Sequence, residues 1–210
     1  MSFNWGSLLT LLQNPLSLVQ TVGYVGVGAI VFAETGLLIG FFLPGDSLLV
    51  ATGLVAAAAG TPLLWLMLFL IAAAILGDAV GFGIGRFLGQ MLYTKKNSFF
   101  FPQKHIQAAR NFYLKHGGKT IILARFVPIL RTFAPCTAGA AGMSYFKFAL
   151  FNVIGGILWI GTMLLSGYYL GKLFGERIND YLHILIGGII LLSLIPLFIG
   201  WWKRKRSYVA

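Results

Sequence analysis

Charged residues are scarce in this chain, and acidic residues are almost absent. Of its 210 residues only 10% are charged, with 5 acidic against 16 basic side chains. Soluble domains carry about 25% charged residues. With 58% hydrophobic residues and a mean hydropathy of +0.86, this chain cannot cover a globular surface with polar groups. These values exclude an ordinary soluble enzyme and, because disorder requires low hydrophobicity, a disordered chain. The sequence therefore predicts an integral membrane protein.

Groups that bind metals or form cross-links are equally few. Cys136 is the single cysteine, which excludes an internal disulfide and a cysteine-based zinc site. The three histidines, His105, His116 and His183, lack metal-ligand spacing. We therefore expect no metal and no cofactor. A cleaved signal peptide needs a basic N-terminal region, and the N-terminal segment of this chain has no basic residue. We therefore expect the N-terminal segment to be retained.

Long apolar stretches with no more than one charged residue predict membrane-spanning helices. A helix crosses the hydrocarbon core with about 20 predominantly apolar residues. Residues 61–85, 145–171 and 181–202 meet this requirement. The last of them is the predicted C-terminal transmembrane helix, and the basic tail 203–210 follows it.

Two further apolar stretches, 18–59 and 120–142, are interrupted by proline. The first is broken at Pro44, and the second at Pro128 and again at Pro135. Proline removes a backbone donor and clashes with the preceding turn. Non-helical backbone at membrane depth persists only where protein buries it or water reaches it. We expect two broken-helix, re-entrant hairpins that face the protein interior; ordinary proline-kinked spanning helices are the alternative.

The two halves of the chain show a weak internal similarity. The prolines at 44 and 128 lie in matching tripeptides, and identical residues recur between 69–89 and 151–171 at an offset of 82. Each unit would then be a broken hairpin followed by a spanning helix. If each unit crosses the membrane once, the second copy is inverted, as in secondary transporters. Chance identity among apolar residues is the alternative.

We expect a single polytopic membrane domain over residues 1–210, all-α in class. Its predicted parts are repeat 1 (18–89), a basic loop (90–118), repeat 2 (119–171), the C-terminal helix (181–202) and the tail (203–210).

The positions of the basic residues predict the orientation in the membrane. Residues 86–119 hold seven basic side chains and no acidic one, and four more follow the last helix. The positive-inside rule places the central loop and the C-terminus in the cytoplasm. The N-terminal side stays open, because residues 18–42 can either span or re-enter. We interpret these charges as orienting charges and expect no nucleic acid partner.

Five ionisable residues fall within or beside the broken segments and the first spanning helix: Glu34, Asp46, Asp78, Arg125 and Arg131. One charge at the centre of a membrane helix costs about 2.5–3.5 kcal/mol. These residues must therefore pair, lie in a hydrated cavity or lose their charge. Structural ion pairs are one interpretation, and Asp78 fits a structural role as well as a place in the site.

A functional interpretation assigns different tasks to the two charge types. Arg125 and Arg131 present planar donor forks that suit the oxygens of a phosphate. Helix starts beyond the breaks at Pro44-Gly45 and Pro128 would add backbone donors. Glu34 and Asp46, removed from water, are candidate proton-coupling groups. Such parts are the minimum of a proton-coupled carrier for an anionic lipid.

Several motifs then carry a family resemblance. They are Phe32-Ala33-Glu34-Thr35-Gly36, Phe42-Leu43-Pro44-Gly45-Asp46-Ser47, Ala124-Arg125-Phe126-Val127-Pro128-Ile129-Leu130-Arg131-Thr132, His116-Gly117-Gly118-Lys119, Ala138-Gly139, Met143-Ser144, and the helix with Asn152, Gly155 and Trp159. In the order and spacing of these motifs, over residues 20–175, the sequence resembles the bacterial DedA family, part of the superfamily of SNARE-associated Golgi (VTT-domain) proteins.

The resemblance implies a multi-pass bacterial inner-membrane flippase. It would return undecaprenyl phosphate across the bilayer for reuse as the cell-wall carrier lipid, driven by the proton gradient. The family's essential acidic and arginine positions correspond to Glu34, Asp46, Arg125 and Arg131. The implied partners are the polyprenyl phosphate, protons and membrane lipids, and an oligomer is compatible with this.

Other functions remain as alternatives. The first is transport of other phospholipids, and the second is proton-coupled export of a small cation or drug, which leaves the arginines poorly explained. A membrane-embedded phosphatase or transferase would need a base beside the phosphate, and no histidine lies in the broken segments. We therefore expect a transporter and not an enzyme. A scaffold without a substrate is the last alternative.

Overall fold

The structure is a computed structural model that describes residues 15–37, 45–94 and 117–174. Within these ranges the regular structure is entirely helical, which confirms the predicted all-α class. The predicted helix 181–202, the tail 203–210, most of the loop 90–118 and Pro44 lie outside the described residues. The helices are α2 (Pro15–Gly36), α3 (Gly45–Ala58), α4 (Leu63–Thr94), α6 (Lys119–Ala124), α7 (Pro128–Ala140) and α8 (Tyr145–Phe174).

Three of these helices contain segments long and apolar enough to cross a membrane. They are Leu18–Gly36 in α2, Leu63–Gly89 in α4 and Tyr145–Leu173 in α8. The helices predicted at 61–85 and 145–171 are thus confirmed as continuous apolar helices. α2 is kinked at Gly23, whose φ of 64° lies in the left-handed region that favours glycine.

The break before Pro128 has a local cause in the sequence. Val127 is extended, with φ −119° and ψ 110°, because a residue that precedes proline is disfavoured in the helical region. Proline itself suits the first turn of a helix, so α7 starts there. The end of α6 is tightened by bonds such as that from the Arg125 N–H to the Ile122 carbonyl oxygen (3.2 Å). Arg125 therefore lies in the turn, and Arg131 lies at the start of α7.

The further break predicted at Pro135 is wrong. α7 continues through Pro135 to Ala140. Proline removes one N–H from the helical ladder and crowds the preceding turn, and neighbouring helices can compensate for these losses within a membrane. The helix ends where Gly142 adopts a φ of 76° and the Met143 N–H donates to the Ala138 carbonyl oxygen (3.1 Å), as in a glycine C-cap.

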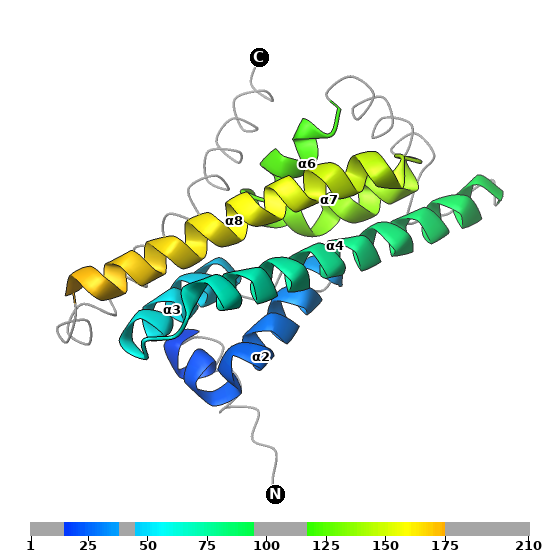
Figure 1. The fold of residues 1–210 in the computed structure, drawn as a ribbon. Coiled ribbons are helices and arrows are strands. Elements are labelled where there is room, and N and C mark those ends of the chain that lie inside the picture. The colour runs from blue at the N-terminus through cyan, green and yellow to red at the C-terminus, as the bar shows by residue number, and fades with distance from the viewer. Residues whose placement is uncertain (1–14, 38–44, 95–116, 175–210) are drawn as a thin grey trace, which may run out of the picture.

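The two long helices, α4 and α8, lie side by side and run in opposite directions (Figure 1). The α2–α3 hairpin lies near one end of this pair, and the α6–α7 segment lies near the other. α3 packs mainly on α8, and α7 packs mainly on α4. The second helix of each hairpin therefore packs on the long helix that follows the other hairpin in the sequence.

Glycines form both of these helix contacts. In α3, Gly53 lies against the backbone of Leu164 and Tyr168, and in α8, Gly167 lies against the backbone of Val50. A Cβ atom at either glycine would collide with that backbone. The absence of a side chain lets the two helices approach closely, as is usual between membrane helices. We call this contact the α3–α8 seam.

The contact between α4 and α7 is built in the same way. Gly85 of α4 lies against the backbone of Cys136, and Gly139 of α7 lies against the backbone of Phe82 and Arg86. We call this contact the α4–α7 seam. The two seams pack the hairpins against the long helices. They thereby determine where the side chains of the hairpins lie in the interior.

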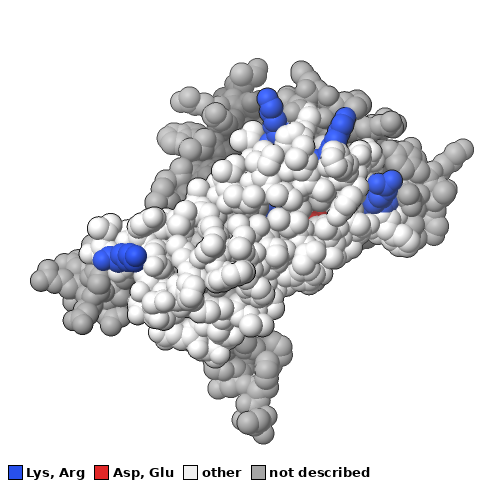
Figure 2. Space-filling view, viewed as in Figure 1, with Lys and Arg blue, Asp and Glu red and all other residues white. Residues whose placement is uncertain are grey.

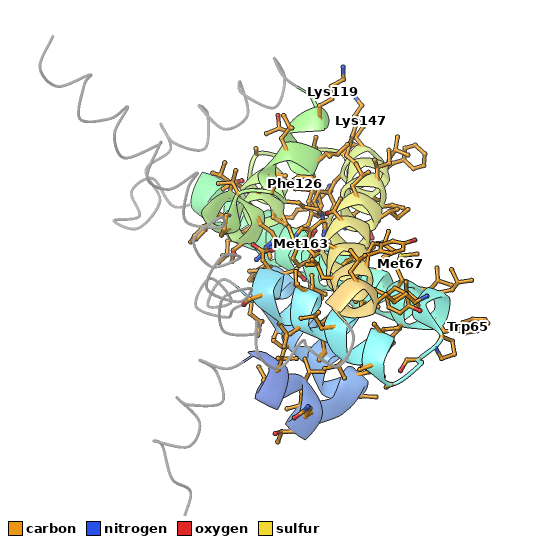
Figure 3. The ribbon with its side chains drawn as sticks, turned by 90° about the vertical axis from the view of Figure 1, so that its left-hand side faces the viewer. Trp65, Met67, Lys119, Phe126, Lys147 and Met163 are labelled. Atoms are coloured by element: carbon orange, nitrogen blue, oxygen red, sulfur yellow. The ribbon has the colours of Figure 1, made fainter. Side chains whose placement is uncertain are left out.

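The outer surface of the helices is apolar. Trp65, Phe146 and Leu173 are 73–80% exposed. The face shown in Figure 2 is almost wholly uncharged, with Lys and Arg side chains at its margins. Figure 3 shows Lys119 and Lys147 at the same end of the helices. An apolar surface with cations at its edges is the pattern expected of a protein surrounded by lipid.

Two neighbouring glycines of α4 allow a matched test of the α4–α7 seam. We expect Gly85→Ala to destabilise the protein by about 1–3 kcal/mol, because an inserted methyl group overpacks the contact with Cys136. Gly83 faces open space, so Gly83→Ala should cause no loss of stability. Thermal unfolding of the purified variants in detergent measures both changes. Equal melting temperatures for the two variants would contradict the seam.

Candidate functional site

The five ionisable residues predicted at membrane depth lie in the interior of the fold. Glu34, Asp78, Arg125 and Arg131 are exposed by 4% or less, and the Asp46 side chain by 18%. They come from both hairpins and from α4, and they form two clusters.

The first group, the Arg131 cluster, consists of Glu34, Asp46, Arg131 and Trp159. The Arg131 guanidinium donates from Nη1 to Asp46 Oδ1 at 2.5 Å and from Nη2 to Glu34 Oε1. The Trp159 indole N–H donates to the same Asp46 oxygen at 2.9 Å. Its ring also lies 4.3 Å from the Arg131 guanidinium carbon, a cation–π contact. One arginine of the second hairpin thus connects two carboxylates of the first.

The start of α3 explains why two carboxylates gather here. Asp46 lies in the first turn of this helix, whose free N–H groups and dipole favour negative charge. Gly45, the first residue of α3, lies directly against the Glu34 carboxylate, and a Cβ at position 45 would occupy its place. The glycine that follows Pro44 thus lets the end of α2 reach the start of α3.

The second group, the Arg125 cluster, consists of Asp78, Arg125 and Asn152. Arg125 Nη2 donates to Asp78 Oδ2 and to Asn152 Oδ1. The Asn152 amide nitrogen donates to the Ile75 carbonyl oxygen at 3.2 Å, which orients its oxygen towards the arginine. Gly155 leaves room for Arg125, because a Cβ there would lie 2.9 Å from the arginine Cδ. This cluster joins α4, α8 and the turn after α6.

Hydrogen bonding in the two clusters is incomplete. Five buried polar atoms have no hydrogen-bond partner: Glu34 Oε2, Asp78 Oδ1, Arg125 Nε, Arg125 Nη1 and Arg131 Nε. An unsatisfied buried polar group costs about 1–3 kcal/mol, and more when it is charged. Three of the five atoms are arginine donors, which an anion or water molecules can satisfy. Arg125 retains two of these donors, whereas Arg131 retains one.

The charges of the two clusters do not balance. Three carboxylates face two guanidinium groups, so the fully ionised group carries one net negative charge. Uptake of a single proton makes it neutral. In the described part of the chain, no three potential metal ligands lie together.

The sequence analysis predicted one phosphate site formed by both arginines, whereas the structure places each arginine in a separate cluster. Glu34 and Asp46 lie with Arg131, whereas Arg125 lies with Asp78. Pro128 and Gly45 lie at the starts of α7 and α3, as predicted for the hairpin breaks.

Asn152 contacts Arg125, and Trp159 contacts Asp46 and Arg131. The sequence interpretation assigned no role to either residue. Both lie on α8, seven residues apart and therefore on one helix face. An asparagine within an otherwise apolar span, on the same face as a tryptophan with an N–H, is the signal that would have indicated them.

The chain is similar to a known protein family and to several known proteins. Residues 43–169 match the model of the VTT domain. Protein DedA of Escherichia coli (strain K12) is 47% identical over 181 residues, covering 85% of this chain and 81% of that protein. A membrane protein of Mycobacterium leprae (strain TN) is 45% identical over 179 residues, with coverage of 85% and 79%. The inner membrane protein YqjA of E. coli (strain K12) is 32% identical over 206 residues, with coverage of 96% and 93%.

No solved structure gives a significant match. The family match covers more than half of the chain, and the relatives are similar over most of their own length. The protein is a membrane protein that belongs to the DedA family of VTT-domain proteins.

Proposed function

We propose that this protein is a proton-coupled transporter of a lipid phosphate, with undecaprenyl phosphate as the substrate. The observation that carries the proposal is the pair of buried arginines, Arg125 and Arg131, whose remaining donors have no partner. A phosphate group offers several anionic oxygens to such donors. The choice of the undecaprenyl tail rests on the resemblance to the DedA family.

The site favours an anionic substrate over a cation. The carboxylates of Glu34, Asp46 and Asp78 already accept hydrogen bonds from guanidinium groups. For a cation, two buried carboxylate oxygens remain without a partner, Glu34 Oε2 and Asp78 Oδ1, and they lie on different clusters beside guanidinium groups that repel a cation. An anion instead meets donors that are free, which makes a cation or drug exporter the weaker candidate.

Charge balance links phosphate binding to protons. A phosphate monoester brings about 1.5–2 further negative charges into a site that already carries an excess of one. A buried excess of this size is costly, so entry of the phosphate favours protonation of the carboxylates. Protonation of Glu34 also weakens its bond to Arg131 and frees that guanidinium nitrogen for the phosphate. Proton uptake and lipid binding then promote each other.

The two glycine seams support the inverted repeat that this transport cycle requires. Gly85 and Gly167 are 82 residues apart, and so are their neighbours in the seams, Phe82 and Leu164. On the hairpin helices, Gly53 and Gly139 are 86 residues apart. Equivalent contacts therefore recur at an offset of 82 on the long helices and of 86 on the hairpin helices, and α4 and α8 run in opposite directions (Figure 1). Each unit comprises a re-entrant hairpin and a long helix, and movement of one unit against the other gives alternating access.

The proposed location is the bacterial inner membrane. One relative carries the name inner membrane protein, and the basic loop 90–118 and the C-terminus are placed in the cytoplasm by the positive-inside rule. Within this proposal the protein moves the lipid without breaking the phosphate ester, so it is not an enzyme.

Reconstitution in liposomes tests the proposal. Transbilayer movement of undecaprenyl phosphate is compared with that of phosphatidylglycerol and of undecaprenol, which lacks the phosphate. Selective transport of the lipid monophosphate supports the proposal. Equal rates for undecaprenyl phosphate and phosphatidylglycerol would indicate a general scramblase, and release of inorganic phosphate would indicate a hydrolase.

Glu34→Gln is expected to abolish the response of transport to a pH gradient. Glutamine can still accept a hydrogen bond from Arg131 but cannot take up a proton. The measurement is the initial transport rate in liposomes with and without an imposed pH gradient. Wild-type protein with a protonophore provides the control, since it removes the gradient and leaves the site intact. Acceleration of the variant by the gradient to the wild-type extent would exclude Glu34 as a proton-coupling group.

A further inference from the structure

Trp159 is the one residue of α8 in the Arg131 cluster, and it touches both members of an ion pair. It is fully buried and is the largest fully buried side chain among the described residues. Its indole N–H donates to Asp46 Oδ1 at 2.9 Å. The face of the same indole carries the guanidinium of Arg131, which itself donates to that oxygen at 2.5 Å. A residue needed only for packing would not have to supply this donor.

The two donors to Asp46 differ in how firmly they are held. The indole belongs to α8, which is packed against α3 through the α3–α8 seam. Arg131 belongs to α7, which is packed mainly on α4. Movement of the hairpins relative to one another would therefore carry Arg131 away from Asp46 and leave Trp159 beside it.

We propose that Trp159 is a positioning residue that holds Asp46 as a charged carboxylate while Arg131 turns to the phosphate of the lipid. This inference rests on the proposed function. When Arg131 leaves, the Asp46 carboxylate, whose side chain is 18% exposed, would lose its guanidinium partner, which is unfavourable for a largely buried charge. The indole N–H remains as its partner and lowers the free-energy difference between the empty and the lipid-bound site.

The other charged groups around Asp46 contribute from each neighbouring element. Glu34 approaches from α2 and Arg131 from α7. Asp78 of α4 and Arg125 of the turn after α6 interact electrostatically with Arg131. A loss of binding in a single variant can therefore reflect a change at any of these four groups. For this reason the test compares two backgrounds, with and without the Asp46 carboxylate.

The experiment measures binding of farnesyl phosphate, a soluble polyprenyl monophosphate, to the purified protein in detergent. In Trp159→Phe the ring remains and the N–H is lost. We expect binding to weaken about 10-fold, because Asp46 then has no side-chain donor in the bound site, whereas in the empty site Arg131 still donates to it. Trp65→Phe is the matched control, because Trp65 is 73% exposed on α4, and its binding should equal that of the wild type.

A double-mutant cycle separates positioning from packing. On the Asp46→Asn background the carboxylate charge is absent, so Trp159→Phe should weaken binding less than about twofold. Equal losses on both backgrounds, or no loss in Trp159→Phe, would overturn the inference. If the wild type binds farnesyl phosphate no better than farnesol, the proposed function itself fails, and this inference fails with it.

A second replacement at position 159 distinguishes loss of the N–H from misfolding of Trp159→Phe. Benzothienylalanine has the shape of tryptophan, with sulfur in place of the N–H. Its incorporation at position 159 should reproduce the loss of farnesyl phosphate binding with the elution profile and melting temperature of the wild type. Wild-type binding by this protein would show that the indole N–H has no such role.

Discussion

Arg131→Lys is expected to reduce lipid transport at least about 100-fold while the protein still inserts into the membrane. Arg131 bridges Glu34 and Asp46 through two different nitrogens and keeps a third donor buried. Lysine retains the positive charge but has one nitrogen and no planar fork. A hydrogen bond to a charged group contributes about 1.5–3 kcal/mol, and each 1.4 kcal/mol corresponds to a factor of ten.

The liposome assay measures this loss against the amount of reconstituted protein. Lys147→Arg is a suitable control, because Lys147 lies exposed near the start of α8 and the variant should transport normally. A clean Arg131→Lys protein with the wild-type rate would remove Arg131 from the phosphate-binding site.

The second large effect concerns Asp78 and Arg125, and it separates stability from transport. Asp78→Leu leaves the Arg125 guanidinium buried without its carboxylate, and we expect the protein to lose about 3–5 kcal/mol of stability. Replacement of both residues, Asp78→Leu with Arg125→Met, removes the unpaired charge and should restore most of that stability. Transport should nevertheless remain at least about 100-fold reduced, because the donors of Arg125 are absent.

Thermal unfolding in detergent and the liposome assay, applied to the same preparations, test both parts of this expectation. A stable double variant that transports lipid at the wild-type rate would identify the pair as purely structural. That result would also answer the question that the sequence left open for Asp78.

The sequence predicted the position of this site better than its internal pairing. Glu34, Asp46, Arg125 and Arg131 could be located because charges are rare in apolar segments and because proline marks the turns beside them. Which acid meets which arginine depends on how the helices are rotated and packed, and no local pattern encodes that. The pair of Arg125 and Asp78 is an example, because these residues are 47 positions apart and meet only when the turn after α6 packs near α4.

Pro135 and Trp159 show where local rules were insufficient. Pro135 was predicted to break its helix, yet the packing of α7 on α4 sustains the helix through it. Trp159 looks like an ordinary apolar residue of a membrane helix, and its polar N–H matters only because α3 places Asp46 beside it. In both cases contacts between distant segments decide the outcome.

The α4–α7 seam gives the wild-type chain an intrinsic reporter. Its backbone contact with Gly85 is made by Cys136, the single cysteine of the sequence, which is buried. Thiol-labelling kinetics on the unmodified protein would therefore report on one defined position between the two proposed units. Separation of these helices during turnover can be followed in real time, in the membrane, without engineered cysteines that would disturb the packing.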